Sequence, residues 1–312
     1  MKRLLLKIQP LTAFGSKING GMLFGQFCCT IKMLCGEERL QSLLDGYCDN
    51  KPFAVFSDAM PQGLVPMPTL PFTMWVPAES SAAERKRWKK MRWLARAALD
   101  YSPDRWHEFA QPHSETDVTR AAVAHNTIRR DTMTTGTDQF APFQKEASFY
   151  EPNSVLDIHI VLDEKRLSQE ELLTIMRVLG QIGFGADASA GLGKFDVLSV
   201  EEERTVDTPC RRYVALSACA PQGTGLRAAN SFFRSQTYFG RHGAERVYGP
   251  SPFKRPILMA APGAVFDCGE AVSLSWIGKG ISGHSVYADT VHQGYGVVLP
   301  IAHWFKETSH AK

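Results

Sequence analysis

Alternating apolar residues predict several strands in the first two thirds of the chain. Residues 2–9 and 156–162 carry apolar side chains at every second position, which is the spacing of one face of a strand. Val55 and Phe56 predict a short strand inside a proline-rich stretch, and residues 195–200 predict a further one. The first 200 residues therefore contain the strands of at least one sheet.

Apolar residues at helical spacing lie between these strands. Residues 20–36 predict an apolar helix, and a short amphipathic segment follows it before Gly46. Residues 82–99 predict a helix with one apolar stripe among many lysines and arginines. Ser168 and Glu171 have the S-x-x-E spacing of a capping box, so a further apolar helix is expected to begin there.

The order of these segments indicates an α+β chain. Residues 100–150 are polar and rich in turn formers, which is typical of a functional insertion or of disorder. Glu201 to Arg204 resemble a solvated linker. A smaller, strand-rich part follows, with candidate strands at 212–219, 256–260, 264–268, 271–277 and 294–301. Strand–helix–strand order with long insertions favours a split βαβ, ferredoxin-like module in the first part.

Length and composition narrow the class of protein. A chain of 312 residues favours two domains. Its 35 Lys and Arg nearly balance 32 Asp and Glu, so a nucleic-acid partner must be argued from local clusters. No apolar run is long enough to predict a membrane span or a signal peptide. Seven cysteines without framework spacing fit a reducing compartment, so we expect a cytoplasmic protein.

A glycine-rich loop at residues 183–194 is the most informative motif. It follows a helix and precedes a strand, which is the reverse of the order in dinucleotide and ATP sites, so neither cofactor is expected. Ser189 and Lys194 flank backbone groups that would be able to cradle phosphates. A tight helix-to-strand connection would also require several glycines. The sequence leaves both readings open.

Two further segments are candidates for RNA contact. His125 to Arg130 places two guanidinium groups beside polar side chains, and planar guanidinium forks suit phosphates and base edges. The basic helix at 85–96 is either an electrostatic footprint for RNA or an ordinary solvated face. An exposed polar loop is the alternative for the first segment.

Catalytic and metal-binding patterns are not found in the sequence. There is no G-x-S-x-G nucleophile motif, and the nine histidines stand in no recognisable triad. Cys28, Cys29, Cys35 and Cys48 lack zinc-finger spacing and fit small buried hydrophobic positions better. We therefore expect neither a metal nor a cofactor.

Several motifs together resemble the RAMP superfamily of CRISPR proteins, and within it the cap subunit of type III-A (Csm) effector complexes. The glycine-rich loop alone marks the superfamily. The cap subunit is indicated by the order of further segments: Pro10 to Gly15, Leu23 to Gly25, Phe56 to Pro61, the basic helix, His125 to Arg129, Gly278 to Gly280 and Val291 to Tyr295. The resemblance covers most of the chain.

The resemblance implies two ferredoxin-like (RRM-related) modules, at residues 1–204 and 205–312, with a long hairpin insertion at about 100–150 in the first. It implies a non-catalytic subunit that holds the 5′ tag of the crRNA and contacts the large polymerase-like subunit and the first backbone subunit. The implied RNA-binding residues are Phe14, Gly15, Ser16, Lys17, His125, Asn126, Arg129, Arg130, Gly183, Gly185, Ser189, Gly191, Gly193 and Lys194. Ala190 replaces a hydroxyl residue that the family often has after Ser189.

Two other functions remain open on the sequence alone. Relatives with the same loop cleave repeat RNA without a metal, and His125 would be the general base, with Lys194 or Arg129 stabilising charge. A protein-interaction module that never touches RNA is the third hypothesis. For the RNA-binding scaffold, bulky residues at Gly191 and Gly193, or alanine at Arg129 and Arg130, are expected to weaken crRNA retention with the fold intact.

Overall fold

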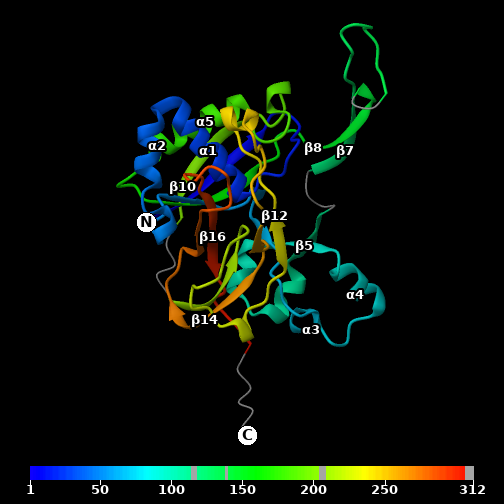
Figure 1. Ribbon diagram of the computed structural model, residues 1–312. Coiled ribbons are helices and arrows are strands. Elements are labelled where there is room, and N and C mark those ends of the chain that lie inside the picture. Colours follow the sequence, from blue (N-terminus) through cyan, green and yellow to red (C-terminus); the bar gives the residue numbers. More distant parts are fainter. Residues whose placement is uncertain (114–117, 138–139, 204–208, 306–312) are drawn as a thin grey trace.

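The largest sheet forms the centre of the molecule (Figure 1). The computed structural model describes residues 1–113, 118–137, 140–203 and 209–305. The strands of this sheet are antiparallel, lie in the order β10-β1-β9-β2, and have β3 beside β9. Their bounds are β1 (Lys2–Pro10), β2 (Ala54–Phe56), β3 (Met60–Pro61), β9 (Leu156–Leu162) and β10 (Phe195–Glu202).

Two capped helices pack on one face of this sheet. Helix α1 (Gly20–Cys35) joins β1 to β2, and α5 (Gln169–Ile182) joins β9 to β10. The Asn19 side chain accepts from the Met22 amide, and Ser168 begins α5 with the predicted capping box. The short helix α2 (Glu37–Leu44) follows α1. The predicted strands and helices of this part of the chain are therefore confirmed.

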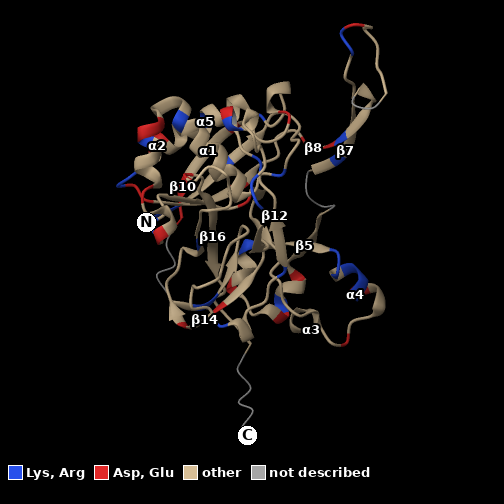
Figure 2. Ribbon diagram, viewed as in Figure 1, with Lys and Arg blue, Asp and Glu red and all other residues tan. Residues whose placement is uncertain are grey.

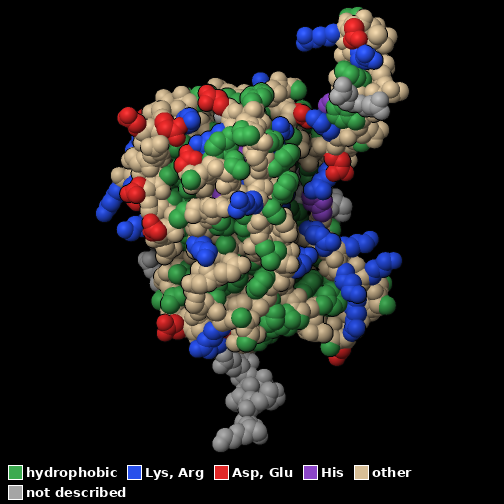
Figure 3. Space-filling model, viewed as in Figure 1, with side chains coloured by type: hydrophobic (Ala, Val, Ile, Leu, Met, Phe, Trp, Pro, Cys, Tyr) green, Lys and Arg blue, Asp and Glu red, His purple; other side chains and the backbone are tan. Residues whose placement is uncertain are grey.

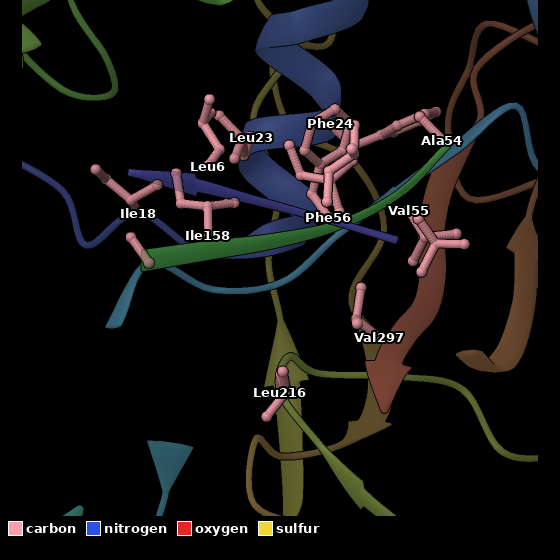
Figure 4. Packing of buried hydrophobic residues seen from close by; sticks show 14 of the residues in the cluster. Leu6, Ile18, Leu23, Phe24, Ala54, Val55, Phe56, Ile158, Leu216 and Val297 are labelled. Carbon is pink, nitrogen blue, oxygen red and sulfur yellow. The ribbon is translucent and has the colours of Figure 1, made fainter. Parts of the chain in front are cut away.

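A second antiparallel sheet covers the opposite face. Its order is β14-β11-β16-β15, with β11 (Cys210–Ala215), β14 (Val265–Val272), β15 (Trp276–Ile281) and β16 (His292–Pro300). All seven residues of β9 are buried, because helices cover one of its faces, and this sheet and the chain between β3 and β9 cover the other. One apolar cluster runs through both parts, from Leu6 and Leu23 to Leu216 and Val297 (Figure 4). A two-stranded ladder of β12 (Ser235–Tyr238) and β13 (Ile257–Ala260) completes this part.

Gln293 closes the free edge of the first sheet. Its side-chain amide donates to the Phe56 carbonyl at 2.8 Å, and its side-chain oxygen accepts from the Phe56 amide at 2.9 Å. The amide therefore substitutes for a neighbouring strand on β2, and it joins the two sheets through a buried contact.

The chain between β3 and β9 is a long insertion. It contains a three-stranded sheet of β4 (Leu64–Pro66), β5 (Met91–Ala95) and β6 (Ala110–Pro112), the helices α3 (Phe72–Trp75) and α4 (Ala82–Trp88), and a hairpin of β7 (Val118–His125) and β8 (Phe143–Tyr150). The hairpin stands away from the body of the molecule (Figure 1). None of the helices within the described ranges is both long and apolar enough to cross a membrane.

The helix predicted over residues 82–99 is wrong in its second half. Helix α4 ends at Trp88, and β5 begins at Met91. Met91 and Trp93 point inward at strand spacing, and β5 pairs with both β4 and β6. The apolar residues of this stretch fit a period of two as well as a helical period, and sheet pairing decides between them.

The linker predicted at residues 201–204 is also wrong over residues 201–203, which the structure describes. Glu201 and Glu202 extend β10, and the carboxylate of Glu203 is buried. That carboxylate accepts from His159 Nδ1 at 2.8 Å and forms an ion pair with Arg96 at 2.6 Å. The predicted boundary between residues 204 and 205 lies outside the described residues.

Candidate nucleic-acid interface

The glycine-rich loop closes on itself between α5 and β10. Gly183 ends α5 with a φ of 101°, and its amide donates to the Leu179 carbonyl. The Phe184 amide donates to the Gly193 carbonyl at 2.9 Å. A Cβ on Gly193 would lie 2.1 Å from the Phe184 carbonyl oxygen, and one on Gly183 would lie 2.4 Å from that of Leu192. Geometry alone therefore accounts for these two glycines.

Gly191 differs from these glycines because the space beside it is open. Its φ is 92°, and no heavy atom lies within 4 Å of the position that a Cβ would take. Ser189 and Lys194, on either side of it, are exposed. The loop thus presents an open backbone position between a hydroxyl group and an ammonium group.

Residues 11–17 run alongside the glycine-rich loop. The Gly193 amide donates to the Ala13 carbonyl at 2.8 Å, and the Ala186 amide donates to Ser16 Oγ at 3.0 Å. A Cβ on Gly15 would lie 2.7 Å from the Ala186 carbonyl oxygen, and one on Gly185 would lie 2.7 Å from Ser16 Cβ. The structure therefore brings together two groups of predicted residues that are about 170 positions apart in the sequence.

Phe14 takes part in this assembly through its backbone. Its ring is buried and packs edge-on against Tyr150 at 5.6 Å between ring centroids. Its amide and carbonyl exchange hydrogen bonds with Ser148 of β8, both at 2.9 Å. The predicted aromatic residue therefore fixes the base of the hairpin and is not available for stacking on a base.

Lys17 is positioned by the buried carboxylate of Asp58, which lies in the Phe56 to Pro61 segment. Asp58 accepts from the Gly20 amide at the start of α1 and lies 3.4 Å from Lys17 Nζ. Burial raises the pKa of Asp58, against the lowering effect of Lys17 and of the Gly20 amide. Asp58 thus orders both the first turn of α1 and the end of the 11–17 loop.

The hairpin residues divide into two groups. At its base, Lys145 of β8 forms an ion pair with Asp187 of the glycine-rich loop at 2.7 Å. His125 is the last residue of β7, and its ring stacks on that of Phe143 with 5.4 Å between the ring centroids. Asn126, Arg129 and Arg130 lie beyond β7 and are exposed, toward the free end of the hairpin (Figure 1).

Arg129 has partners of its own at that end. It forms an ion pair with Asp131 at 3.1 Å and lies over the Phe140 ring. The described contacts therefore join Lys145 to the glycine-rich loop and Ser148 to Phe14 in residues 11–17, whereas the contacts of Arg129 are local. The sequence did not single out Lys145 or Ser148. No sequence motif marked these two residues, which lie three positions apart and therefore point to opposite faces of β8.

A cluster of positive charge lies beside this assembly. His113 is close to Lys17, Arg92 and Arg120, which come from three different segments. Burial, followed by the charges of Arg120, Lys17 and Arg92, lowers the pKa of His113. Figures 2 and 3 show lysines and arginines gathered on α4 and on the side of the molecule between α4 and the hairpin.

Sequence comparisons do not relate this chain to known proteins: no protein-family model matches it, and neither does any curated protein. Comparison with solved structures, in contrast, finds chains of similar fold. The Csm4 chain of a Csm1–Csm4 cassette in complex with pppApA has a TM-score of 0.61 and 17% identity, covering 98% of this chain and 100% of that chain.

A second Csm4 chain, from a Csm3–Csm4 subcomplex of the type III-A CRISPR-Cas interference complex, has a TM-score of 0.60 and 13% identity. It covers 96% of this chain and 99% of that chain. Over nearly its whole length, this chain therefore has the fold of the Csm4 subunits of type III-A CRISPR complexes, the group that its sequence motifs resemble.

Proposed function

We propose that this chain is a non-catalytic RNA-binding subunit of a type III-A CRISPR antiviral effector complex, in the cytoplasm, and that it holds the 5′ tag of the crRNA. The observation that carries the proposal is the assembly of residues 11–17, the glycine-rich loop and the base of the hairpin into one exposed surface. This surface occurs in a fold shared with Csm4 chains from complexes with Csm1 and Csm3.

The chemistry of the surface suits a single RNA strand. Gly191 leaves room for a backbone to approach, and Ser189 and Lys194 offer a hydroxyl donor and a positive charge beside it. Lys17 adds a second exposed charge at the other side of the loop pair. Single strands are held by such phosphate contacts, with close approach permitted by glycine.

The first part of the chain is proposed to be a ferredoxin-like module. Its chain order β1–α1–β2–β9–α5–β10 is a split βαβ repeat, and its sheet order β10-β1-β9-β2 is the 4-1-3-2 arrangement that this repeat produces. Strands β11 to β16 form the proposed second module, which carries no α-helix within residues 209–305.

Docking to a large polymerase-like subunit and to a backbone subunit is also proposed. The C-terminal part leaves large apolar side chains in solvent, including Phe239, Phe253 and Tyr248, the last with 92% of its surface exposed. The first two stack on each other at 5.4 Å. Apolar groups gathered in this way are typical of a surface that is covered by a partner.

Metal-independent cleavage of repeat RNA is the alternative. It needs His125 and Lys194 or Arg129 around one ribose, but His125 is stacked on Phe143 and Arg129 is held by Asp131 and Phe140. The decisive assay is incubation of the purified chain with repeat RNA in chelator. Cleavage that is lost in His125→Ala would overturn the scaffold proposal.

The binding proposal is tested on RNA that copurifies with the tagged protein from its host. We expect short RNAs that share one constant 5′ end. Lys194→Glu is expected to reduce the bound RNA about tenfold, because one phosphate contact becomes a repulsion. Lys165→Glu is the matched control, since Lys165 is exposed and lies at the far end of β9 from the loop. Equal RNA content in the two variants would contradict the site.

A further inference from the structure

Six positively charged side chains lie on and just after α4, and no contact among the described residues explains why they are basic. Among the described residues none of the six forms an ion pair, and α4 buries no side chain. The carboxylate of Glu84, the acid of this helix, is engaged by Ser81 in the capping box. The six residues are Arg85, Lys86, Arg87, Lys89, Lys90 and Arg92.

The contacts that these side chains do make are few. Arg85 and Arg92 donate to nearby backbone carbonyls, and Lys89 lies over the Phe72 ring. Lys86 and Lys90 are exposed and extend into solvent. Like charges this close repel one another at low ionic strength, so the cluster costs stability in the isolated chain. An anionic partner would remove that cost.

The cluster is continuous with the candidate RNA surface. Arg92 precedes Trp93, whose ring lies 6.5 Å from that of His113. Arg120 pairs with Ser148 in the hairpin, and Ser148 bridges Phe14 next to the glycine-rich loop. We call this line of residues the basic strip: Lys17, Arg120, Arg92, Lys90, Lys89 and Lys86. It follows the side of the molecule between β7 and α4 (Figures 2 and 3).

We propose that the basic strip binds the phosphate backbone of RNA that continues beyond the glycine-rich loop, without regard to its sequence. The inference rests on the proposed function, because it extends the path of the same strand. Lys86, Lys89, Lys90 and Arg92 form no ion pair among the described residues, and they lie on or just after a helix with no fully buried residue. Such cations fit a strand with one charge on every nucleotide. An acidic protein surface would also complement them, but it would not explain their continuity with the loop.

The test measures binding of the full chain to labelled oligouridine over a range of salt concentrations. The variant Lys86→Glu with Lys90→Glu reverses two exposed charges. We expect its affinity to fall at least tenfold at low salt. The slope of log affinity against log salt is expected to become shallower by about 1.4, since each contact contributes about 0.7 for a single strand.

The matched control is Lys165→Glu with Arg177→Glu, which makes the same change in net charge at exposed positions of the first part. It is expected to bind within about twofold of the unmodified chain. An α4 variant that binds RNA like this control would overturn the basic strip. Binding that is lost in Lys194→Glu but kept in the α4 variant would overturn the strip alone and leave the proposed function standing.

Two further outcomes are decisive. An unmodified chain that binds no oligouridine would overturn the strip, whereas the proposed function would then be judged by the RNA that copurifies from the host. An α4 variant with normal RNA affinity that no longer copurifies with a large partner subunit would assign the strip to protein docking. Both double variants are expected to have the melting temperature of the unmodified chain. A difference in RNA affinity between them then reports binding and not loss of the fold.

Discussion

Gly193→Ala is expected to destabilise the chain by about 3–5 kcal/mol, because the added Cβ would overlap the carbonyl oxygen of Phe184. The two atoms would be 2.1 Å apart, and the same carbon would lie 2.6 Å from the Phe184 nitrogen. These are backbone atoms at the start of the glycine-rich loop, so relief requires the two ends of the loop to move apart. Thermal unfolding should show a lower melting temperature, by on the order of 10 °C.

Gly191→Ala is the control for this prediction, since both glycines have positive φ. Its free energy of unfolding is expected to fall by only about 1–2 kcal/mol, which is the cost of a left-handed backbone at alanine. No packing cost is added, because nothing lies within 4 Å of the new carbon. The folded variant is expected to bind RNA more weakly, as its methyl group occupies the open position beside Ser189 and Lys194. Equal destabilisation by the two substitutions would contradict the packing described for Gly193.

This pair corrects an expectation from the sequence. Counting glycines treated Gly191 and Gly193 alike, as positions where a bulky residue leaves the fold intact and weakens RNA retention. The structure separates them, since Gly193 lies against Phe184 and Gly191 faces open space. A glycine in a sequence indicates a missing Cβ but not which atoms lie next to it.

Much of the fold was predictable because its elements have local signals. The alternation in β1 and β9 and the capping box at Ser168 depend on residues within a few positions of each other. The strand at Met91–Ala95 was not predictable in this way, since its pairing with β4 and β6 overrides an equally good helical pattern.

The candidate site was predictable in its parts and not in its assembly. The motifs named residues 11–17 and the glycine-rich loop, and the hydrogen bonds of Ser16 and Gly193 join them. Lys145 and Ser148 were missed as site residues because each acts through a partner distant in the sequence. The contacts of Asp58 with Lys17 and with the Gly20 amide likewise join distant segments. The basic strip likewise depends on three segments that meet only in the folded chain.

Glu203→Ala is expected to be the second large destabilisation, of about 3–5 kcal/mol, because it leaves the buried His159 ring and the partly exposed Arg96 without the buried carboxylate that both contact. The Glu203 side chain is 5% exposed and connects His159 in the first sheet with Arg96 in the insertion. Glu202→Ala is the control on the same strand. That side chain is 65% exposed and pairs with Lys2, so its loss is expected to cost less than about 1 kcal/mol.

The charge of Glu203 also predicts how stability depends on pH. Burial raises the pKa of Glu203, but the hydrogen bond from His159 and the charges of His159, Arg96 and Arg3 outweigh burial, so the pKa lies below its ordinary value of 4.5. As pH falls, the unfolded chain therefore takes up this proton before the folded chain does. The stabilisation is complete above about pH 5 and is lost as pH falls through the folded pKa. Melting temperatures of the unmodified chain and of Glu203→Gln should thus differ most at neutral pH and converge in acid. A difference that stays constant from neutral to acidic pH would show that the carboxylate acts through its shape and not through its charge.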